Sequence, residues 1–278
     1  MSNYDTFSTE KILEIGINNL TEEQIEKYTK DIIDTLYFEQ NNKKWSYVRS
    51  PMQYKAVKKT YPWGIKTCYE KTSSKIYQIL QASRGFSFIG KGSLIDNATK
   101  MDKEADTLIK LPVVFNRIEE LDKFFNGFSQ FDNFVELGFR IPVLLKHFRS
   151  KNLNVHGYDI AILSILLSKH LGYNVNHQDF SEVEDDTMID LKDNSLIVSY
   201  HMLEHVPDPY KAIKCIAKNM KEDSYFHVEV PIERTPNLRA GHLYQFNPGE
   251  LGLMLKECKL TECLKKTTST EERYLVKK

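Results

Sequence analysis

The sequence predicts an α/β fold in which a doubly wound, mainly parallel sheet follows an added, mostly helical N-terminal region. From residue 131 onward, short apolar runs alternate with amphipathic segments, whereas the first 130 residues show helical spacings and one Pro- and aromatic-rich stretch. Alternation of this kind is typical of βαβ units, in which helices connect parallel strands. We therefore expect an N-terminal region, residues 1–128, and a second domain, residues 129–278.

The predicted strands of the second domain are short buried runs. They span residues 134–137, 153–158, 173–177, 195–200 and 225–230. Helices are predicted between them from apolar residues at i, i+3 and i+4 spacing. Their ends are indicated by Gly172 after residues 160–171, by Asp208 and Pro209 as N-cap and first helical residue, and by Asn247–Glu250 before the last helix.

The N-terminal region contains two predicted helix starts. Thr21 with Gln24 has the spacing of a capping box, and Asn116 with Glu119 has the same spacing. The stretch at 45–100 shows no clean period, so no fold is predicted for it.

The net charge of zero is a cancellation between segments. The 38 Lys and Arg residues equal the 38 Asp and Glu residues, which excludes a uniformly basic protein such as a histone. Residues 1–40 hold nine acids and three bases, whereas residues 41–92 hold eleven bases and one acid. Aromatic residues are interleaved with these bases, so residues 41–92 are the segment that we expect to contact a binding partner.

Cysteine usage and targeting signals favour a cytoplasmic protein. The four cysteines show no CxxC spacing, and neither a disulfide framework nor a zinc motif is visible. The N-terminus has no apolar h-region, and no run approaches the roughly 18 apolar residues of a membrane span. We therefore expect no membrane partner.

Acidic residues follow the first three predicted strands. Glu136 ends the first strand, Asp159 follows the second, and Asp179 follows the third. Ligands of doubly wound sheets bind outside the carboxyl ends of the strands, and an acid after the second strand can accept both ribose hydroxyls of a nucleoside.

Residues 131–265 resemble the class I S-adenosylmethionine-dependent methyltransferases, which have a Rossmann-like sheet. The strongest segment is Leu203-Glu204-His205-Val206-Pro207-Asp208-Pro209, which looks like the branch that includes ubiquinone-pathway and sugar O-methyltransferases. The resemblance implies S-adenosylmethionine as cofactor. It implies a binding site formed by Glu136, Gly138, Phe139 and Arg140 in the first loop, Asp159 and Ile160 at the ribose, Asp179 and Phe180 at the adenine, and Tyr200 and His201 after the fourth strand.

One departure from the family pattern lies in the first loop. Arg140 and Pro142 stand where the family usually has its second and third glycines. Pro142 has no N–H to donate to a ligand. Arg140 either turns outward, meets the methionyl carboxylate, or weakens the cofactor site. A nicotinamide site is disfavoured, because a lone Gly138 is far from G-x-G-x-x-G.

His201, Glu204 and His205 lie at i, i+3 and i+4 after the fourth strand, and His242 follows the fifth strand. One interpretation makes His205 or His201, with Glu204, the catalytic group that removes a hydroxyl proton. A second makes all four residues ligands of a divalent metal ion, with His201 shifting the preference toward a softer metal. A third gives them a structural role in holding the loop.

The acceptor is expected to meet aromatic and basic side chains. The candidates are Trp45, Trp63 and Lys66 in the basic segment, and His242 and Tyr244 after the fifth strand. Aromatic faces stack on sugars and bases, while lysines attract phosphates. An equal alternative is a solvated charged face with a few aromatic residues packing on the core, which docks against the acidic residues 1–40.

The sequence thus predicts an S-adenosylmethionine-dependent O-methyltransferase acting on a small molecule, with the hydroxyl of a sugar or glycan, with or without a phosphate, as the leading acceptor. The N-terminal region would select the acceptor or act as a lid. The alternatives are an RNA or cap methyltransferase, for which no nucleic-acid motif is visible, and a non-catalytic binding module with a degenerate fold.

Overall fold

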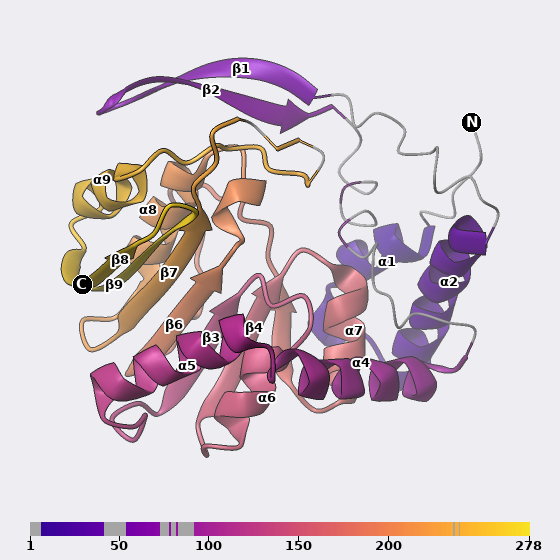
Figure 1. The fold of residues 1–278 in the computed structure, drawn as a ribbon. Coiled ribbons are helices and arrows are strands. Elements are labelled where there is room, and N and C mark those ends of the chain that lie inside the picture. Colours follow the sequence, from indigo (N-terminus) through magenta and orange to yellow (C-terminus); the bar gives the residue numbers. More distant parts are fainter. Residues whose placement is uncertain are drawn as a thin grey trace.

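A seven-stranded sheet forms the centre of the protein, with strand order β5-β4-β3-β6-β7-β9-β8 (Figure 1). The computed structural model describes residues 7–41, 54–72, 92–235 and 240–278, together with 78, 82, 237 and 238. Five strands pair in parallel, and they are β3 (Asn133–Leu137), β4 (Asn154–Asp159), β5 (Asn174–His177), β6 (Ser195–Tyr200) and β7 (Tyr225–Pro231). The predicted fold class is confirmed, and the five predicted strands agree with these to within one residue at each end.

The chain reverses its direction across the sheet between β3 and β6. β4 and β5 extend the sheet on one side of β3, whereas β6 and β7 extend it on the other. The carboxyl ends of β3 and β6 therefore border a crevice at the topological switch point, where open α/β sheets bind ligands.

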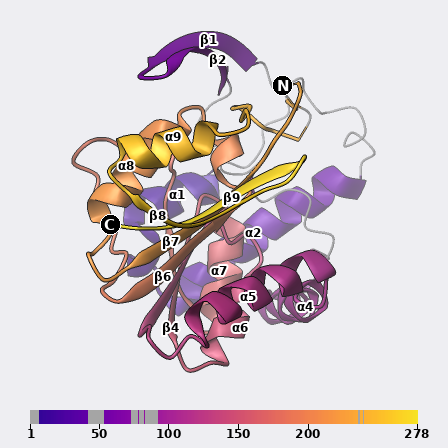
Figure 2. The ribbon, with the colours of Figure 1, turned by 60° about the vertical axis from the view of Figure 1, so that its left-hand side comes forward.

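Two C-terminal strands, which the sequence pattern did not reveal, complete the sheet. β8 (Thr261–Thr267) and β9 (Glu271–Lys277) form an antiparallel hairpin, and β9 pairs antiparallel with β7 (Figure 2). β8 is mostly exposed and lies at the sheet edge, so its polar sequence hides the strand.

The two faces of the sheet bury two hydrophobic clusters. Neighbouring strand residues face opposite sides, so Phe134 belongs to the first cluster and Val135 to the second. The first cluster is covered by α5 (Pro112–Phe125), α6 (Val143–Arg149) and α7 (Ile162–His170), and the second by α8 (Pro209–Asn219) and α9 (Glu250–Glu257) (Figure 2).

Side-chain caps explain the starts of α2 (Glu22–Asn41), α4 (Leu94–Leu108) and α8. The Asp208 side chain accepts from the Lys211 backbone N–H at 3.2 Å, with Pro209 as the first residue of α8. The Thr21–Gln24 capping box is present, with hydrogen bonds of 2.9 and 3.2 Å. The second predicted box is wrong, because α5 begins earlier, with Leu111 as N-cap and Pro112 as its first residue. Proline's fixed φ starts a helix there without a side-chain cap.

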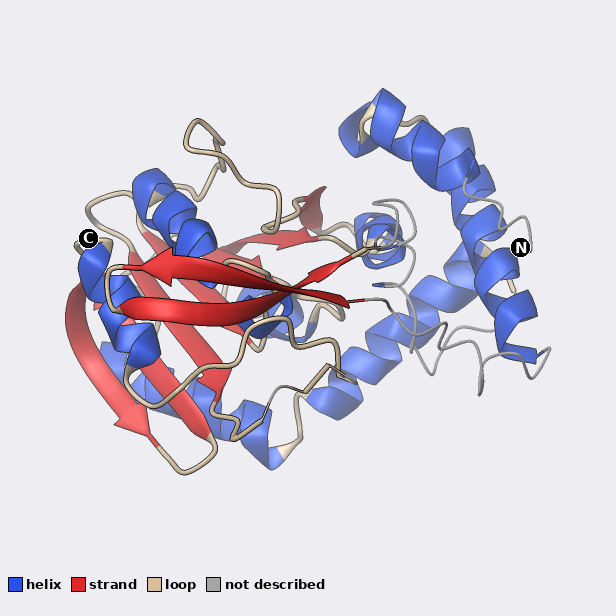
Figure 3. Cartoon of the chain, turned by 90° about the horizontal axis from the view of Figure 1, so that it is seen from above, coloured by secondary structure: helices blue, strands red, loops and turns tan. Residues whose placement is uncertain are grey.

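The N-terminal region packs against the sheet domain with helices and one hairpin. α1 (Phe7–Ile15), the 3-10 turn η1 (Ile17–Asn19), α2 (Glu22–Asn41) and α4 (Leu94–Leu108) contribute to the first hydrophobic cluster. Within the stretch for which no fold was predicted, β1 (Tyr54–Tyr61) and β2 (Gly64–Lys71) form an antiparallel hairpin that contributes to the second cluster. Seen from above in Figure 3, this hairpin crosses over the sheet.

No helix among the described residues combines the length and apolar character that a bilayer crossing requires. The division near residue 128 stays a prediction.

Candidate functional site

The first loop of the site follows β3 and approaches the segment after β6 closely. The Gly138 N–H donates to the Tyr158 carbonyl at 2.7 Å, which fastens the loop to β4. Gly138 has φ +78°, and a Cβ on it would lie 2.7 Å from Cγ of Met202. Only glycine fits this position, because both the backbone conformation and the close approach exclude a side chain.

Arg140 takes a left-handed backbone conformation in the same loop, with φ +46°. Its backbone N–H donates to Oδ2 of Asp159 at 2.7 Å, and the Ala161 N–H donates to Oδ1 at 2.7 Å. Burial raises the pKa of Asp159, while the backbone N–H groups act in the opposite direction. The loop thus holds the Asp159 carboxylate in place, which explains why the chain tolerates a strained Arg140.

Glu136 is a buried carboxylate with spare hydrogen-bonding capacity. Its Oε2 atom has no partner among the described residues, and burial raises its pKa well above the ordinary value. The Leu145 N–H donates to the carboxylate and opposes this rise. Such a group favours a ligand that donates a hydrogen bond or carries a positive charge.

A cavity of about 360 Å³ opens beside Glu136. The first loop, with Gly138 and Arg140, forms one wall, and Tyr200 and Arg117 form another. Arg117 comes from α5 and lies 5.0 Å from the Tyr200 ring. The cavity therefore combines two carboxylates, Glu104 and Glu136, with cationic and aromatic groups at the switch point.

The predicted adenine residues lie at the end of β5. Asp179 is buried, and its Oδ1 accepts from the Ser181 N–H at 2.8 Å. Phe180 is buried in the second hydrophobic cluster, and Ile160 is partly buried against the first. Phe180 and Ile160 thus lie on opposite faces of the sheet, near the ends of the strands.

His201 is held between two buried carboxylates. Its Nε2 atom lies 2.9 Å from Oε1 of Glu229, and its Nδ1 atom lies 3.2 Å from Oε1 of Glu204. Burial lowers its pKa, but the hydrogen bonds to Glu204 and Glu229 outweigh this and raise the pKa to about 9. His201 is therefore an imidazolium at neutral pH.

Glu229, in the middle of β7, is the centre of a charged network that sequence reasoning missed. Arg117 of α5 and Arg273 of β9 both donate to its carboxylate, which is fully buried. Burial raises its pKa, but His201 and Arg117 outweigh this and lower it to about 2. An acid inside the apolar run Tyr225–Val230 was the available sequence signal, but its partners lie 112 and 44 residues away.

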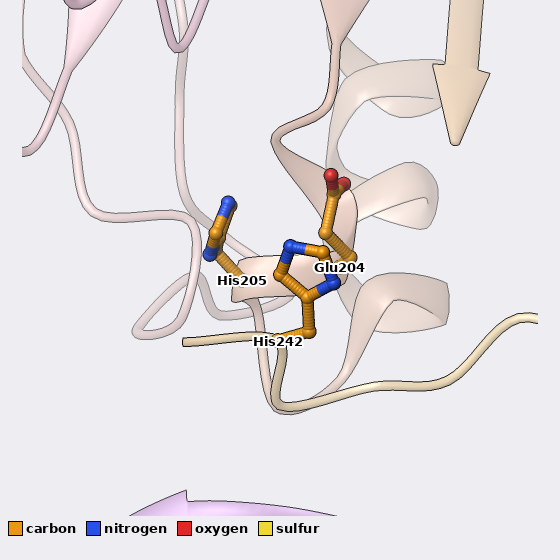
Figure 4. Close-up of side chains that lie close together, drawn as sticks. All are labelled: Glu204, His205 and His242. Atoms are coloured by element: carbon orange, nitrogen blue, oxygen red, sulfur yellow. The ribbon is translucent and has the colours of Figure 1, made fainter. Parts of the chain in front are cut away.

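Glu204, His205 and His242 converge next to this network (Figure 4). Glu204 and His205 belong to the 3-10 turn η3 (Leu203–His205), whereas His242 comes from the loop after β7. Their potential ligand atoms lie within 4.8 Å of one another. The two imidazole rings meet edge to face, with centroids 4.9 Å apart. The predicted fourth member, His201, contacts Glu204 but also groups with Glu229 and Glu271.

The environment of His205 favours one neutral tautomer. Its Nδ1 atom lies 3.1 Å from the Gly241 carbonyl oxygen, which can only accept a hydrogen bond. Nδ1 therefore carries the hydrogen, and Nε2 has a lone pair available. The His205 side chain is exposed, but the desolvation of its ring lowers its pKa below the ordinary value, which favours the neutral form at physiological pH.

Three predicted acceptor residues meet at Glu250, the first residue of α9. The Trp63 Nε1–H donates to Oε1 at 3.2 Å, the Tyr244 hydroxyl donates to Oε1 at 2.5 Å, and Lys66 forms an ion pair with the same carboxylate. Trp63 also stacks on Tyr61 at 5.1 Å. These side chains dock the hairpin onto α9, whereas the alternative interpretation of the basic segment placed its docking partner in the acidic residues 1–40. Trp45 lies outside the described residues.

Residues 113–267 match the family model described as a methyltransferase domain, which is more than half of the chain. The chain belongs to this methyltransferase family. The match begins inside α5, so α1, α2 and the β1–β2 hairpin lie outside it.

Solved methyltransferase structures are similar to this methyltransferase at low identity. A putative sarcosine dimethylglycine methyltransferase from Galdieria sulphuraria is 14% identical over 59% of this chain and 86% of its own, with a TM-score of 0.49. An S-adenosylmethionine-dependent methyltransferase from Clostridium acetobutylicum is 15% identical over 63% and 98%, with a TM-score of 0.44. No curated protein matches the sequence.

The methyltransferase is S-adenosylmethionine-dependent by family, and its strand ends fit this cofactor. Glu136 presents an unpartnered buried oxygen beside a cavity that also contains Arg117. The carboxylate of Asp159 accepts the backbone N–H groups of Arg140 and Ala161 and a further backbone hydrogen bond from Ile160, which leaves a lone pair for a ribose hydroxyl. The donor set therefore suits a ligand with an ammonium group and ribose hydroxyls.

Proposed function

We propose that this methyltransferase transfers the methyl group of S-adenosylmethionine to a hydroxyl of a small molecule, with a sugar or glycan as the leading acceptor. The observation that carries the proposal is the neutral His205, whose Nδ1 is engaged by Gly241 and whose Nε2 has its lone pair available. A hydroxyl oxygen becomes a strong nucleophile only as it loses its proton, so its methylation requires such a base.

The strand-end residues take the cofactor roles in this proposal. Glu136 binds the ammonium group, Asp159 accepts from the ribose hydroxyls, and Asp179 with Phe180 borders the adenine. The unpartnered oxygen of Glu136 and the fixed orientation of Asp159 support this assignment. Bound S-adenosylmethionine supplies the methyl group, and the residues of this chain bind it, orient the acceptor and remove the proton.

His201 and His205 have different roles in this mechanism. Because His201 is protonated at neutral pH, it cannot accept the acceptor's proton. It instead holds Glu204 on one side and Glu229 on the other. His205 accepts the hydroxyl proton at Nε2 while the methyl group moves to the oxygen, and it later releases this proton to solvent.

A divalent ion at Glu204, His205 and His242 is the alternative way to activate the hydroxyl. Its support is that Oε2 of Glu204 is buried and has no hydrogen-bond partner among the described residues. A mixed imidazole and carboxylate set suits zinc or a similar metal more than magnesium. Full turnover after dialysis against a chelator, without added metal, would exclude the ion; loss that zinc or manganese restores would establish it.

The cofactor is tested first by calorimetry with S-adenosylhomocysteine. We expect saturable binding by the wild type and at least about tenfold weaker binding by Glu136→Gln, which keeps the shape but not the charge. Absence of binding at high micromolar ligand would leave only the non-catalytic module.

The acceptor is tested by measuring S-adenosylhomocysteine release with sugars, nucleotide-linked sugars, phosphorylated sugars and RNA. We expect turnover with a hydroxyl-bearing small molecule, and His205→Gln to lower kcat by about 10²–10⁴-fold. His170→Gln, on the exposed end of α7, is the matched control and should keep full activity. Turnover with RNA alone would replace the small-molecule acceptor.

A further inference from the structure

The β1–β2 hairpin is an addition to the methyltransferase domain, because residues before 113 lie outside the family match. One end of the hairpin follows the loop after β7. The Tyr69 N–H donates to the Leu243 carbonyl at 2.9 Å, and the Tyr54 hydroxyl donates to the Leu238 carbonyl at 3.1 Å. The loop beside this end also carries His242, so the hairpin end borders the His205–His242 pair.

Most of the core-side cations of the hairpin are used for docking. Lys66 pairs with Glu250, and Lys59 lies 3.5 Å from Asp208 and 3.7 Å from Glu70. These contacts, with the Trp63 hydrogen bond to Glu250, fix the hairpin on α8 and α9. Among the described residues, these docking contacts do not involve the side chain of the last hairpin residue, Lys71.

Lys71 differs from the other hairpin cations. It pairs with Tyr54 across the hairpin, at the end that follows the β7 loop. Its side chain is partly buried, and its ammonium forms no ion pair or hydrogen bond with any residue that the structure describes. A partly buried, unpaired cation is costly unless a ligand neutralises it.

The surroundings of Lys71 connect the cofactor and acceptor sides of the site. Asp179, at the predicted adenine position, and His205 are both close enough for electrostatic interaction with its ammonium. The pKa of Lys71 is lowered by burial, and Asp179 compensates only in part. Of the acids farther along this side, Glu204 is bonded to His201 through Oε1, and Glu233 lies 2.9 Å from Nδ1 of His242, so neither is paired with Lys71.

We propose that Lys71 binds an anionic oxygen group of the methyl acceptor, a phosphate or a carboxylate, and so brings the acceptor hydroxyl to His205. The inference rests on the proposed function, because it names the class of acceptor that the same site takes. The hairpin then acts as the selecting element: a neutral acceptor lacks the group that Lys71 recognises.

The test uses inorganic phosphate and acetate as probes of the full-length protein loaded with S-adenosylhomocysteine. Amide chemical shifts of residues 64–71 are followed by NMR while each probe replaces chloride at constant ionic strength. We expect saturable phosphate or acetate binding by the wild type, with at least about tenfold weaker binding by Lys71→Met. Lys71→Arg keeps the charge and should retain binding. The matched control is Lys58→Met, an exposed lysine of β1 that should bind as the wild type does.

Three results would overturn the inference: no probe binding by the wild type, unchanged binding by Lys71→Met, or equal weakening by Lys58→Met, which indicates diffuse attraction. S-adenosylhomocysteine affinity is measured on the same samples. Lost cofactor binding by the wild type refutes the proposed function, whereas intact cofactor binding with no role of Lys71 refutes only this inference. If Lys71→Met loses cofactor affinity but keeps phosphate binding, Lys71 supports the cofactor site through its electrostatic interaction with Asp179, and the inference also fails.

Discussion

His227 makes the stability of this methyltransferase depend on pH below neutrality. The side chain lies inside β7 with 1% exposure, and its Nδ1 atom is 2.6 Å from the Tyr200 hydroxyl. Burial, with smaller contributions from Arg273 and Arg117, lowers its pKa from 6.5 to about 3. The folded protein therefore keeps the ring neutral at pH values where the unfolded chain protonates it.

The sign and size of the effect follow from this difference. Because the unfolded state binds the proton more readily, the free energy of unfolding falls as pH decreases below 6.5. Between pH 7 and pH 5 the unfolded histidine becomes almost fully protonated while the folded one does not, which corresponds to a loss of about 2 kcal/mol from this residue.

The perturbation is His227→Gln, which removes the titration and retains a hydrogen-bonding side chain beside Tyr200. Urea unfolding of the wild type and the variant is measured at pH 7 and pH 5. We expect the wild type to lose about 2 kcal/mol more than the variant over this interval. His170→Gln, exposed on α7, should behave as the wild type does. Equal losses in the wild type and His227→Gln would refute the assignment.

Three further changes test the rest of the site. Glu229→Gln leaves Arg117 and Arg273 without their buried partner and should lower the free energy of unfolding by about 3 kcal/mol in urea titrations; a loss below about 1 kcal/mol would contradict the network. Gly138→Ala should weaken S-adenosylhomocysteine binding at least about tenfold in calorimetry, because its Cβ collides with Met202 in a φ +78° backbone. Gly172→Ala, at φ +76° with nothing within 4 Å, should cost about 1 kcal/mol of stability and leave binding unchanged. Trp63→Phe removes the hydrogen bond to Glu250 and should speed hydrogen exchange in β2 but not in β3; equal exchange in both proteins would show that this bond does not hold the hairpin.

The five parallel strands and the acids at their ends could be predicted because they depend on local signals. A buried strand such as β6 is an apolar run in sequence, and a parallel sheet brings all carboxyl ends to one edge. Glu136, Asp159 and Asp179 therefore come together without knowledge of any long-range contact. The short motif around Glu204 and His205 could be placed directly after the fourth predicted strand for the same reason.

The elements that were missed lack these signals. β8 is exposed and rich in lysine and threonine, and β1 and β2 are polar on their outer faces, so neither hairpin has a strong apolar period. The second capping box was wrong because Pro112 starts α5 before Asn116. In both cases tertiary packing or a neighbouring residue outweighs the local pattern.

By itself, the sequence of this protein determined the fold class, the strand positions and the candidate strand-end carboxylates, because these follow from periodicity within a few residues. Only the tertiary structure decided the state of each group. His201 is a cation because folding brings it into contact with Glu229 of the adjacent strand, which is 28 residues away in the sequence. Trp63 is a docking residue because folding brings it into contact with Glu250, which is 187 residues away in the sequence. Charge state and partner choice depend on burial and on contacts between distant segments, which exist only once the chain has folded.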